Sequence, residues 1–193
     1  MKKLIAIVGK TASGKDALFK GIINDYSLIN PIIHYTTRPK RPKEEEGKDY
    51  HFITELEFLN KKSKDEFYTI TTFKENWHYC IAADSFSSKK INVGVFNLAE
   101  LQSLIESNDF ELYIIEIFAC EKVRKARYLS RLLEPTPEEL SEFERRFAAD
   151  DKDFEVLKDI PHQRLYTDYT GSEFYNAGFI SGLLYSIGYG LEN

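Results

Sequence analysis

The sequence GKTASGKD, residues 9–16, follows directly on the apolar run LIAIV, residues 4–8. The run has the length of a short buried strand, and residues 16–23 carry apolar side chains at helical spacing. Between a strand and a helix, the pattern G-x-x-x-x-G-K forms a loop whose backbone N–H groups and helix end bind phosphate. We therefore predict a phosphate-binding loop here, in preference to an ordinary turn that happens to contain glycine.

The last position of the loop departs from the pattern. A Ser or Thr is expected there as a ligand of Mg²⁺, and this chain has Asp16. A carboxylate is also an oxygen ligand, so Asp16 can coordinate Mg²⁺ directly or through water. Alternatively, Asp16 only interacts with the positive N-terminus of the helix. We predict that Asp16 is a metal ligand and that Lys15 reaches the outer phosphates of the bound nucleotide.

The composition is that of one soluble globular domain, with 193 residues, 42% hydrophobic and 30% charged. The net charge of −5 argues against a broad nucleic-acid surface. Cys80, Cys120 and the scattered histidines fit neither a disulfide framework nor a zinc site. The apolar run after MKK is too short for a signal peptide, and no run approaches the ~20 residues of a membrane helix. We expect a cytoplasmic protein that binds neither nucleic acid nor membrane.

Strand and helix patterns alternate along the chain. Two capping boxes, Thr54 with Glu57 and Thr136 with Glu139, each predict the start of a helix. Expected strands cover residues 4–8, 31–36, 50–53, 67–73, 77–82, 91–96, 112–118 and 164–167, and expected helices cover 16–23, 55–62, 98–105, 121–133, 137–150 and 172–187. This alternation predicts an α/β fold with a parallel sheet covered by helices, the three-layer α/β/α architecture of P-loop proteins.

A second motif, TTRPKRPKEEEGKDYHF, covers residues 36–52. Its prolines favour an extended chain, on which Arg38 and Arg41 stand three residues apart, and Tyr50 follows a glycine turn. Two arginines on such a segment can hold a phosphate from two directions through bidentate hydrogen bonds. Charge alone, however, favours a solvated charged loop over a phosphate site.

The two motifs, in this order and spacing, resemble those of guanylate kinases. The resemblance extends from Leu4 to about Asp168 and is strongest over the first 55 residues. It implies a P-loop nucleoside-monophosphate kinase that transfers the γ-phosphate of ATP, with Mg²⁺, to GMP, dGMP or a related nucleotide. It also implies a single domain, residues 1–193, with a core at 1–33 and 84–193, a small inserted lobe for the monophosphate at about 34–83, and a helical lid at about 127–146.

The resemblance assigns roles to residues that match the family pattern. The ATP-binding residues are Gly9, Ala12, Ser13, Gly14, Lys15 and Asp16, and the catalytic residues are Lys15, Arg127, Arg131, Arg145 and Arg146. The acceptor-binding residues are Arg38, Arg41, Tyr50, Tyr79, Thr69 and Thr71. Helical spacing puts Arg124, Arg127 and Arg131 on one face of one helix, for which a solvated basic stripe is the alternative. Tyr79 is equally well explained as a core aromatic.

The chain departs from the family where the base would be recognised. Guanylate kinases carry Ser four residues before the first phosphate-binding Arg, and this chain has His34. The guanine-reading Glu has no counterpart near residues 67–72, and the expected Asp-x-Asp reads Gly94-Val-Phe96. The phosphate-binding end is intact, and the base that is accepted is left open.

Two other functions remain possible from the sequence. One is a guanylate-kinase-like binding module without turnover, although such modules usually lack a functional P-loop. The other is a P-loop kinase for a different small phosphorylated acceptor, since a site discriminates strongly only when its polar partners are present.

Overall fold

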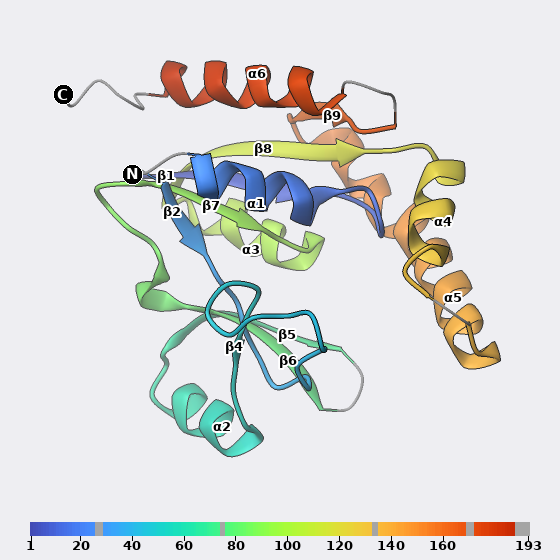
Figure 1. Cartoon of the computed structure of the whole chain (residues 1–193). Helices are drawn as coiled ribbons and strands as arrows, with labels where there is room; N and C mark the ends of the chain where they lie inside the picture. Colours follow the sequence, from blue (N-terminus) through green and yellow to red (C-terminus); the bar gives the residue numbers. More distant parts are fainter. Residues whose placement is uncertain (26–28, 74–75, 133–134, 169–171, 188–193) are drawn as a thin grey trace.

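The computed structural model describes residues 1–25, 29–73, 76–132, 135–168 and 172–187. Its centre is a parallel sheet in the order β2-β7-β1-β8-β9 (Figure 1). The strands are β1 (Lys2–Val8), β2 (Ile29–Ile32), β7 (Ile91–Val95), β8 (Phe110–Phe118) and β9 (Gln163–Tyr166). The predicted α/β class with a parallel sheet is confirmed.

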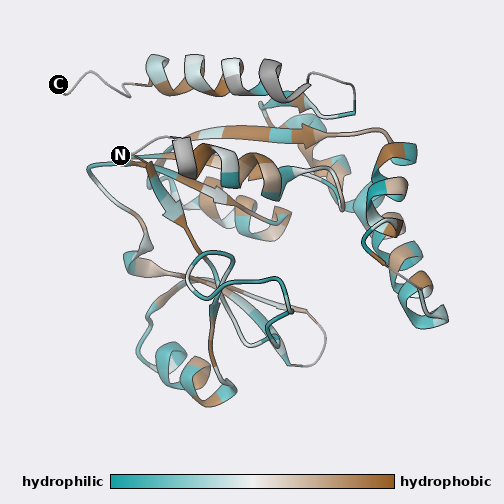
Figure 2. Cartoon of the chain, viewed as in Figure 1, coloured by the Kyte–Doolittle hydropathy of each residue, from teal (hydrophilic) through white to brown (hydrophobic). Residues whose placement is uncertain are grey.

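Helices cover both faces of this sheet. Two of them, α1 (Lys15–Asp25) and α6 (Ser172–Ser186), pack on one face, and α3 (Leu98–Ser107) packs on the other together with the 3₁₀ helix η2 (Phe154–Asp159). The first face buries Phe19, Ile22, Ile180 and Leu184, and the second buries Leu101, Leu104 and Leu157. Figure 2 shows the hydrophobic colour concentrated in the strands between these layers. Burial of these apolar side chains, at about 25 cal/mol per Å², holds the layers together.

A second, smaller sheet lies beside the first, in the order β4-β3-β6-β5. It contains β3 (Tyr35–Thr36), β4 (His51–Phe52), β5 (Phe67–Phe73) and β6 (Trp77–Ala82), and it is followed by the short 3₁₀ helix η1 (Ala83–Ser85). The helix α2 (Glu55–Ser63) begins at the predicted capping box and buries Phe58 against His78, with 3.9 Å between ring centroids. The predicted hairpin is confirmed in its strands; residues 74–75 of its turn lie outside the described residues.

One predicted strand was wrong. Residues 31–36 form parts of two strands in different sheets, because the chain leaves β2 after Ile32 and enters β3 at Tyr35. Pro31 lies in β2 at the edge of the parallel sheet, where a missing N–H costs least. The connecting residues Ile33 and His34 therefore stand where the two sheets meet, and His34 is buried there.

Two helices, α4 (Glu121–Leu129) and α5 (Pro137–Asp153), stand at the carboxyl end of β8 (Figure 1). The capping box at Thr136 is present, as predicted. The expected helix over 121–133 ends at Leu129, so Arg131 lies in the turn beyond it rather than on a helical face with Arg124. Residues 133–134 of the break lie outside the described residues. Within the described ranges, no helix is long and apolar enough to cross a membrane.

Candidate active site

The loop between β1 and α1 folds back tightly on itself. A Cβ on Gly9 would come within 2.5 Å of Ser13 Oγ and 2.7 Å of the Ile117 carbonyl oxygen, so only glycine fits there. Ala12 and Gly14 have positive φ values of 60° and 101°. Residues with positive φ turn successive backbone N–H groups toward a common concavity, which suits an anion. The loop thus has the backbone form that phosphate binding requires.

The underside of the loop is held by side chains from the far end of the chain. The Ser13 carbonyl oxygen accepts hydrogen bonds from Thr167 Oγ1 at 2.6 Å and Arg127 Nη1 at 3.1 Å. Arg127 also donates to both the hydroxyl and the carbonyl oxygen of Thr167. Ser13 itself is fully buried. The guanidinium of Arg127 therefore supports the loop from beneath.

The outer side of the loop is held by a carboxylate of α5. Asp150 accepts hydrogen bonds from the Thr11 backbone N–H at 2.7 Å and from Arg124 Nη1 at 3.0 Å. Only 4% of the Arg124 side chain is exposed, and its guanidinium lies 4.4 Å from the ring centroid of Phe147. A buried, charge-assisted pair of this kind is costly to break from one side. It fixes the position of Thr11 relative to α4 and α5.

The second motif wraps a buried arginine. Arg38, 4% exposed, donates to Glu44 Oε1 and to the Pro39 carbonyl oxygen, each at 2.7 Å. Glu44 also accepts the backbone N–H of Arg41 at 2.8 Å. Burial opposes the charged forms, but these hydrogen bonds raise the pKa of Arg38 and lower that of Glu44. Arg41 itself is exposed and lines the cleft described below.

Two tyrosines stand next to this arginine. The Tyr50 and Tyr79 rings meet edge to face at 5.9 Å, and the Arg38 guanidinium lies 5.4 Å from the Tyr50 centroid. Burial and the neighbouring Tyr79 raise the pKa of Tyr50 to about 12, so the Tyr50 hydroxyl stays a protonated donor at neutral pH. Hydroxyl donors beside an arginine are suited to a phosphate.

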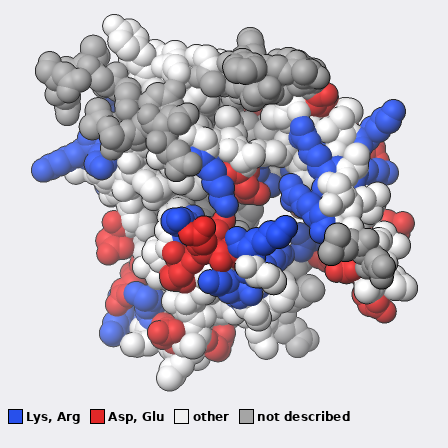
Figure 3. All heavy atoms as spheres, viewed as in Figure 1, with Lys and Arg blue, Asp and Glu red and all other residues white. Residues whose placement is uncertain are grey.

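A cleft of about 1500 Å³ joins the two motifs. Lys15 and Asp16 line one side of it, and Arg38, Arg41 and Tyr50 line another. Figure 3 shows Lys and Arg side chains around the hollow between the small lobe and the helices α4 and α5. The basic residues that line it are Lys15, Lys20, Arg38, Arg41, Lys43, Lys48, Arg131, Arg145 and Arg146. Positive side chains on several sides of the cleft favour a ligand with several negative charges.

The predicted threonines lie in different places. Thr71 lines the cleft, with its Oγ1 3.5 Å from Glu100 Oε1. Thr69 is 7% exposed and does not line the cleft. Their register on β5 explains this, because Thr69 pairs with Ile81, whereas Thr71 pairs with Tyr79, which lies in the cleft beside Tyr50.

Two of the predicted lid arginines, Arg145 and Arg146, are tied to one carboxylate. Both oxygens of Glu142 accept from Arg145, at 2.7 and 3.0 Å, and one of them accepts from Arg146 at 2.8 Å. These hydrogen bonds lower the pKa of Glu142 to about 2. Arg145 and Arg146 also lie 5.0 and 5.9 Å from the ring centroid of Phe73 on the small lobe. The lid helix and the lobe therefore touch across the mouth of the cleft.

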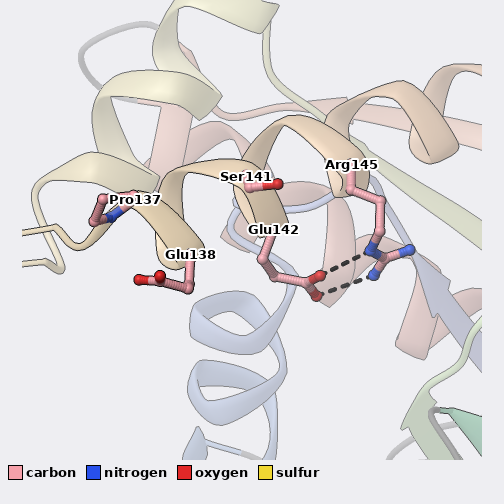
Figure 4. A pocket seen from close by; sticks show the side chains of 5 residues that line it. All are labelled: Pro137, Glu138, Ser141, Glu142 and Arg145. Carbon is pink, nitrogen blue, oxygen red and sulfur yellow. Dashed lines mark hydrogen bonds and ion pairs between the residues drawn. The ribbon is translucent and has the colours of Figure 1, made fainter.

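A smaller hollow of about 460 Å³ lies along the start of α5 (Figure 4). The paired side chains of Glu142 and Arg145 lie at one end of it, and Pro137, Glu138 and Ser141 come from the preceding turns of the same helix. It is far smaller than the cleft and lacks any part of either phosphate motif, so the cleft is the better candidate for the active site.

A magnesium ion would have few protein ligands here. Among the described residues, no group of three or more His, Cys, Asp or Glu side chains is placed to hold a metal. Asp16 is exposed at the second position of α1 and lines the cleft. Mg²⁺ keeps several waters and is commonly held by one carboxylate together with substrate phosphates, so this single ligand fits the ion.

Sequence reasoning missed several residues that the structure brings into this region, Asp150 and Glu100 among them. Asp150 lies 139 positions from Thr11, and only the fold brings them together. Glu100 is buried in the cleft beside His34. The pattern Asn97-x-x-Glu100 does signal a capping box, which the structure contains, but a cap alone does not predict burial.

The parallel sheet, the glycine loop before α1 and the cleft define a P-loop nucleotide-binding protein of the α/β class. The guanylate kinase family model matches residues 1–118. The chain therefore belongs to the guanylate kinase family.

Individual relatives agree with this assignment. The chain is 37% identical over 92 residues to the guanylate kinase of Thermotoga maritima, covering 48% of this chain and 44% of that protein. It is 26% identical over 163 residues to that of Caulobacter vibrioides, covering 84% of this chain and 68% of the relative. The match thus spans less than half of the Thermotoga protein. A crystal structure of guanylate kinase from Anaplasma phagocytophilum superposes with a TM-score of 0.66 at 18% identity, covering 96% of this chain and 86% of that one, which supports the fold.

Proposed function

We propose that this protein is an ATP-dependent nucleoside-monophosphate kinase that transfers the γ-phosphate of ATP to GMP, dGMP or a related nucleotide. The observation that carries the proposal is that one cleft contains both Lys15 of the phosphate-binding loop and Arg38, Arg41 and Tyr50 of the second motif. A donor and an acceptor phosphate held in one cleft are what phosphoryl transfer needs.

In this mechanism each group of residues has one task. The loop N–H groups and Lys15 hold the phosphates of ATP, while Arg38, Arg41, Tyr50 and Tyr79 hold the acceptor phosphate. Mg²⁺, with Asp16 as its protein ligand, would neutralise charge on the donor phosphates. The acceptor presents an anionic oxygen at neutral pH, so no general base is needed.

The lid supplies the remaining charge. Arg131, Arg145 and Arg146 line the cleft, and we assign them to the γ-phosphate during transfer. Arg127 donates to the loop and to Thr167, so its contribution is to position the loop. In this proposal the core covers residues 1–33 and 84–193, the lobe at about 34–83 holds the acceptor, and the lid covers about 127–146. Closure of the lid over the core would exclude water from the reaction.

Phosphoryl transfer from ATP and Mg²⁺ to a panel of ribo- and deoxyribonucleoside monophosphates tests the proposal. Lys15→Met is the blank. It removes the positive charge that Lys15 would place beside the transferred phosphoryl group, and it keeps a side chain of similar length. Turnover that disappears in the variant is expected. Tight ATP binding by folded wild-type protein with no turnover on any acceptor would contradict the proposal, and would favour a binding module or a different phosphorylated acceptor.

A further inference from the structure

A buried carboxylate stands in the cleft away from the phosphate-binding residues. Glu100, the third residue of α3, is 2% exposed and lines the cleft. Its Oε2 accepts the Asn97 backbone N–H at 2.9 Å, which completes the capping box. Within the described chain, no Lys or Arg forms an ion pair with it. A carboxylate buried this deeply needs further hydrogen-bond donors.

The other oxygen of Glu100 has two polar neighbours, one from each side of the cleft. Oε1 lies 3.3 Å from His34 Nε2 and 3.5 Å from Thr71 Oγ1. His34 is 8% exposed, and its Nε2 makes no well-aligned hydrogen bond in the described part of the chain. The cleft therefore contains a buried row of three polar groups, with Glu100 Oε1 between His34 Nε2 and Thr71 Oγ1. Of these, His34 Nε2 still lacks a well-aligned hydrogen-bond partner among the described residues.

The neighbouring strand end explains why the carboxylate comes from α3. A Cβ on Gly94 would lie 2.6 Å from Cζ of Phe96, so the phenyl ring occupies the space above that residue. The same ring lies 5.7 Å from the imidazole of His34. The end of β7 is therefore apolar and cannot supply an acid, and Glu100 is the acidic side chain that reaches His34.

We propose that Glu100, flanked by His34 and Thr71, recognises the base of the acceptor nucleotide, and that this base presents a lactam edge, an N–H beside a carbonyl. The inference rests on the proposed kinase function, because it needs the acceptor in this cleft. A carboxylate only accepts hydrogen bonds, so the middle group of the base edge must be an N–H. His34 Nε2–H then donates to the adjacent carbonyl oxygen.

This row distinguishes the common bases. Guanine and hypoxanthine offer N1–H beside O6, and uracil and thymine offer N3–H beside O4. Adenine N1 and cytosine N3 are lone pairs that would face the carboxylate of Glu100. A buried acceptor set against another acceptor costs about 10- to 100-fold in affinity. GMP and IMP are therefore expected to bind alike within about tenfold, since Oε2 is engaged by the cap and leaves one oxygen for the base.

The test is calorimetric binding of GMP, IMP, 1-methyl-GMP, UMP, AMP and CMP to the wild-type protein and to Glu100→Gln. Gln also serves in a capping box, so the variant keeps α3. The variant is expected to bind its lactam nucleotide 10- to 100-fold more weakly and to lose the preference over AMP, with ATP affinity within twofold. The matched control is Glu57→Gln, the same substitution in the exposed capping box of α2, which is expected to change none of these ratios.

Binding does not require turnover, so the two proposals fail separately. Selective binding of lactam nucleotides without phosphoryl transfer would refute the kinase and leave the role of Glu100 standing. A preference for GMP and IMP, or a preference for UMP, would support the lactam edge and identify which base supplies it. Equal wild-type affinity for AMP and GMP, full affinity for 1-methyl-GMP, or an unchanged GMP-to-AMP ratio in Glu100→Gln would overturn it.

Discussion

Replacing Asp150 with Ala should cost more stability than its partly exposed position on α5 suggests. The substitution removes the acceptor for the Thr11 N–H and for Thr11 Oγ1, and it leaves Arg124 charged with 4% of its side chain exposed. Removing one partner of a buried pair typically costs about 3–5 kcal/mol. For a chain of this size, each kcal/mol lowers Tm by roughly 2–4 °C, so we expect a decrease of about 6–20 °C.

The neighbouring residue provides a matched control. The Asp151 side chain is 64% exposed, pairs with Lys10 at 2.7 Å and lies 4.0 Å from Arg124. An exposed ion pair contributes about 0–1 kcal/mol, so Asp151→Ala should lower Tm by no more than a few degrees. Thermal and urea unfolding of both variants at pH 7 measure the difference.

A double-mutant cycle separates the pair from its surroundings. In Asp150→Ala with Arg124→Met, no buried charge remains uncompensated, and Met can still pack on Phe147. The double variant should therefore be more stable than the sum of the two single changes predicts, by about 1–3 kcal/mol. Additive effects, or an Asp150→Ala variant as stable as Asp151→Ala, would refute the assignment of this pair as the clamp on the loop.

Three further predictions concern the packing at Gly94, the ion pairs of Glu142 and the two arginines Arg127 and Arg131. Gly94→Ala should destabilise by about 1–3 kcal/mol in urea unfolding, because its Cβ meets Phe96 at 2.6 Å, and Phe96→Leu should recover part of the loss; an unchanged midpoint would argue against this packing. The pKa of Glu142 is held at about 2, below its ordinary 4.5, so its ion pairs stabilise above about pH 4.5 and are lost as the pH falls through about 2. Glu142→Gln should accordingly lower stability near neutral pH and flatten the acid limb of the stability curve, and parallel curves would count against it. Arg131→Ala should lower kcat by about 10³–10⁵ at unchanged Tm, while Arg127→Ala lowers Tm as well because Arg127 supports the loop; equal thermal stability of the two variants would contradict the distinction.

Features encoded in short stretches of sequence were predicted well. The strands of the β5–β6 hairpin have the predicted limits. Their many aromatic and β-branched residues favour an extended chain locally, and the pairing in the folded sheet favours the same conformation. The capping boxes at Thr54 and Thr136 were also identified, since each is complete within four residues. Local patterns decide where such elements begin.

Features that depend on tertiary packing were not predicted. The break at Ile33 and His34 has no local stop signal; it exists because β2 pairs with β7 and β3 pairs with β6. Arg131 keeps the helical spacing of Arg124 in the sequence, yet α4 ends at Leu129. Periodicity alone cannot supply that end point, because Ser130 and Arg131 are compatible with a helix.

The same limit applies to the end of the cleft that we assign to the base. The sequence shows that the acidic residues of the family pattern are missing there, but only the structure shows that Glu100 lies in the same cleft. A family carboxylate at the end of β7 cannot be restored simply by changing Gly94, because the Phe96 ring occupies the space that its side chain would need. The ring, the absent Cβ and the buried His34 form one packed unit, so they must change together. Glu100 does not need the space that Phe96 occupies, because it projects from α3. The helix cap fixes its Oε2, and its Oε1 faces His34. An acid held in this way keeps its direction without a lysine or arginine, so we expect the base preference to survive the loss of the family's own residues.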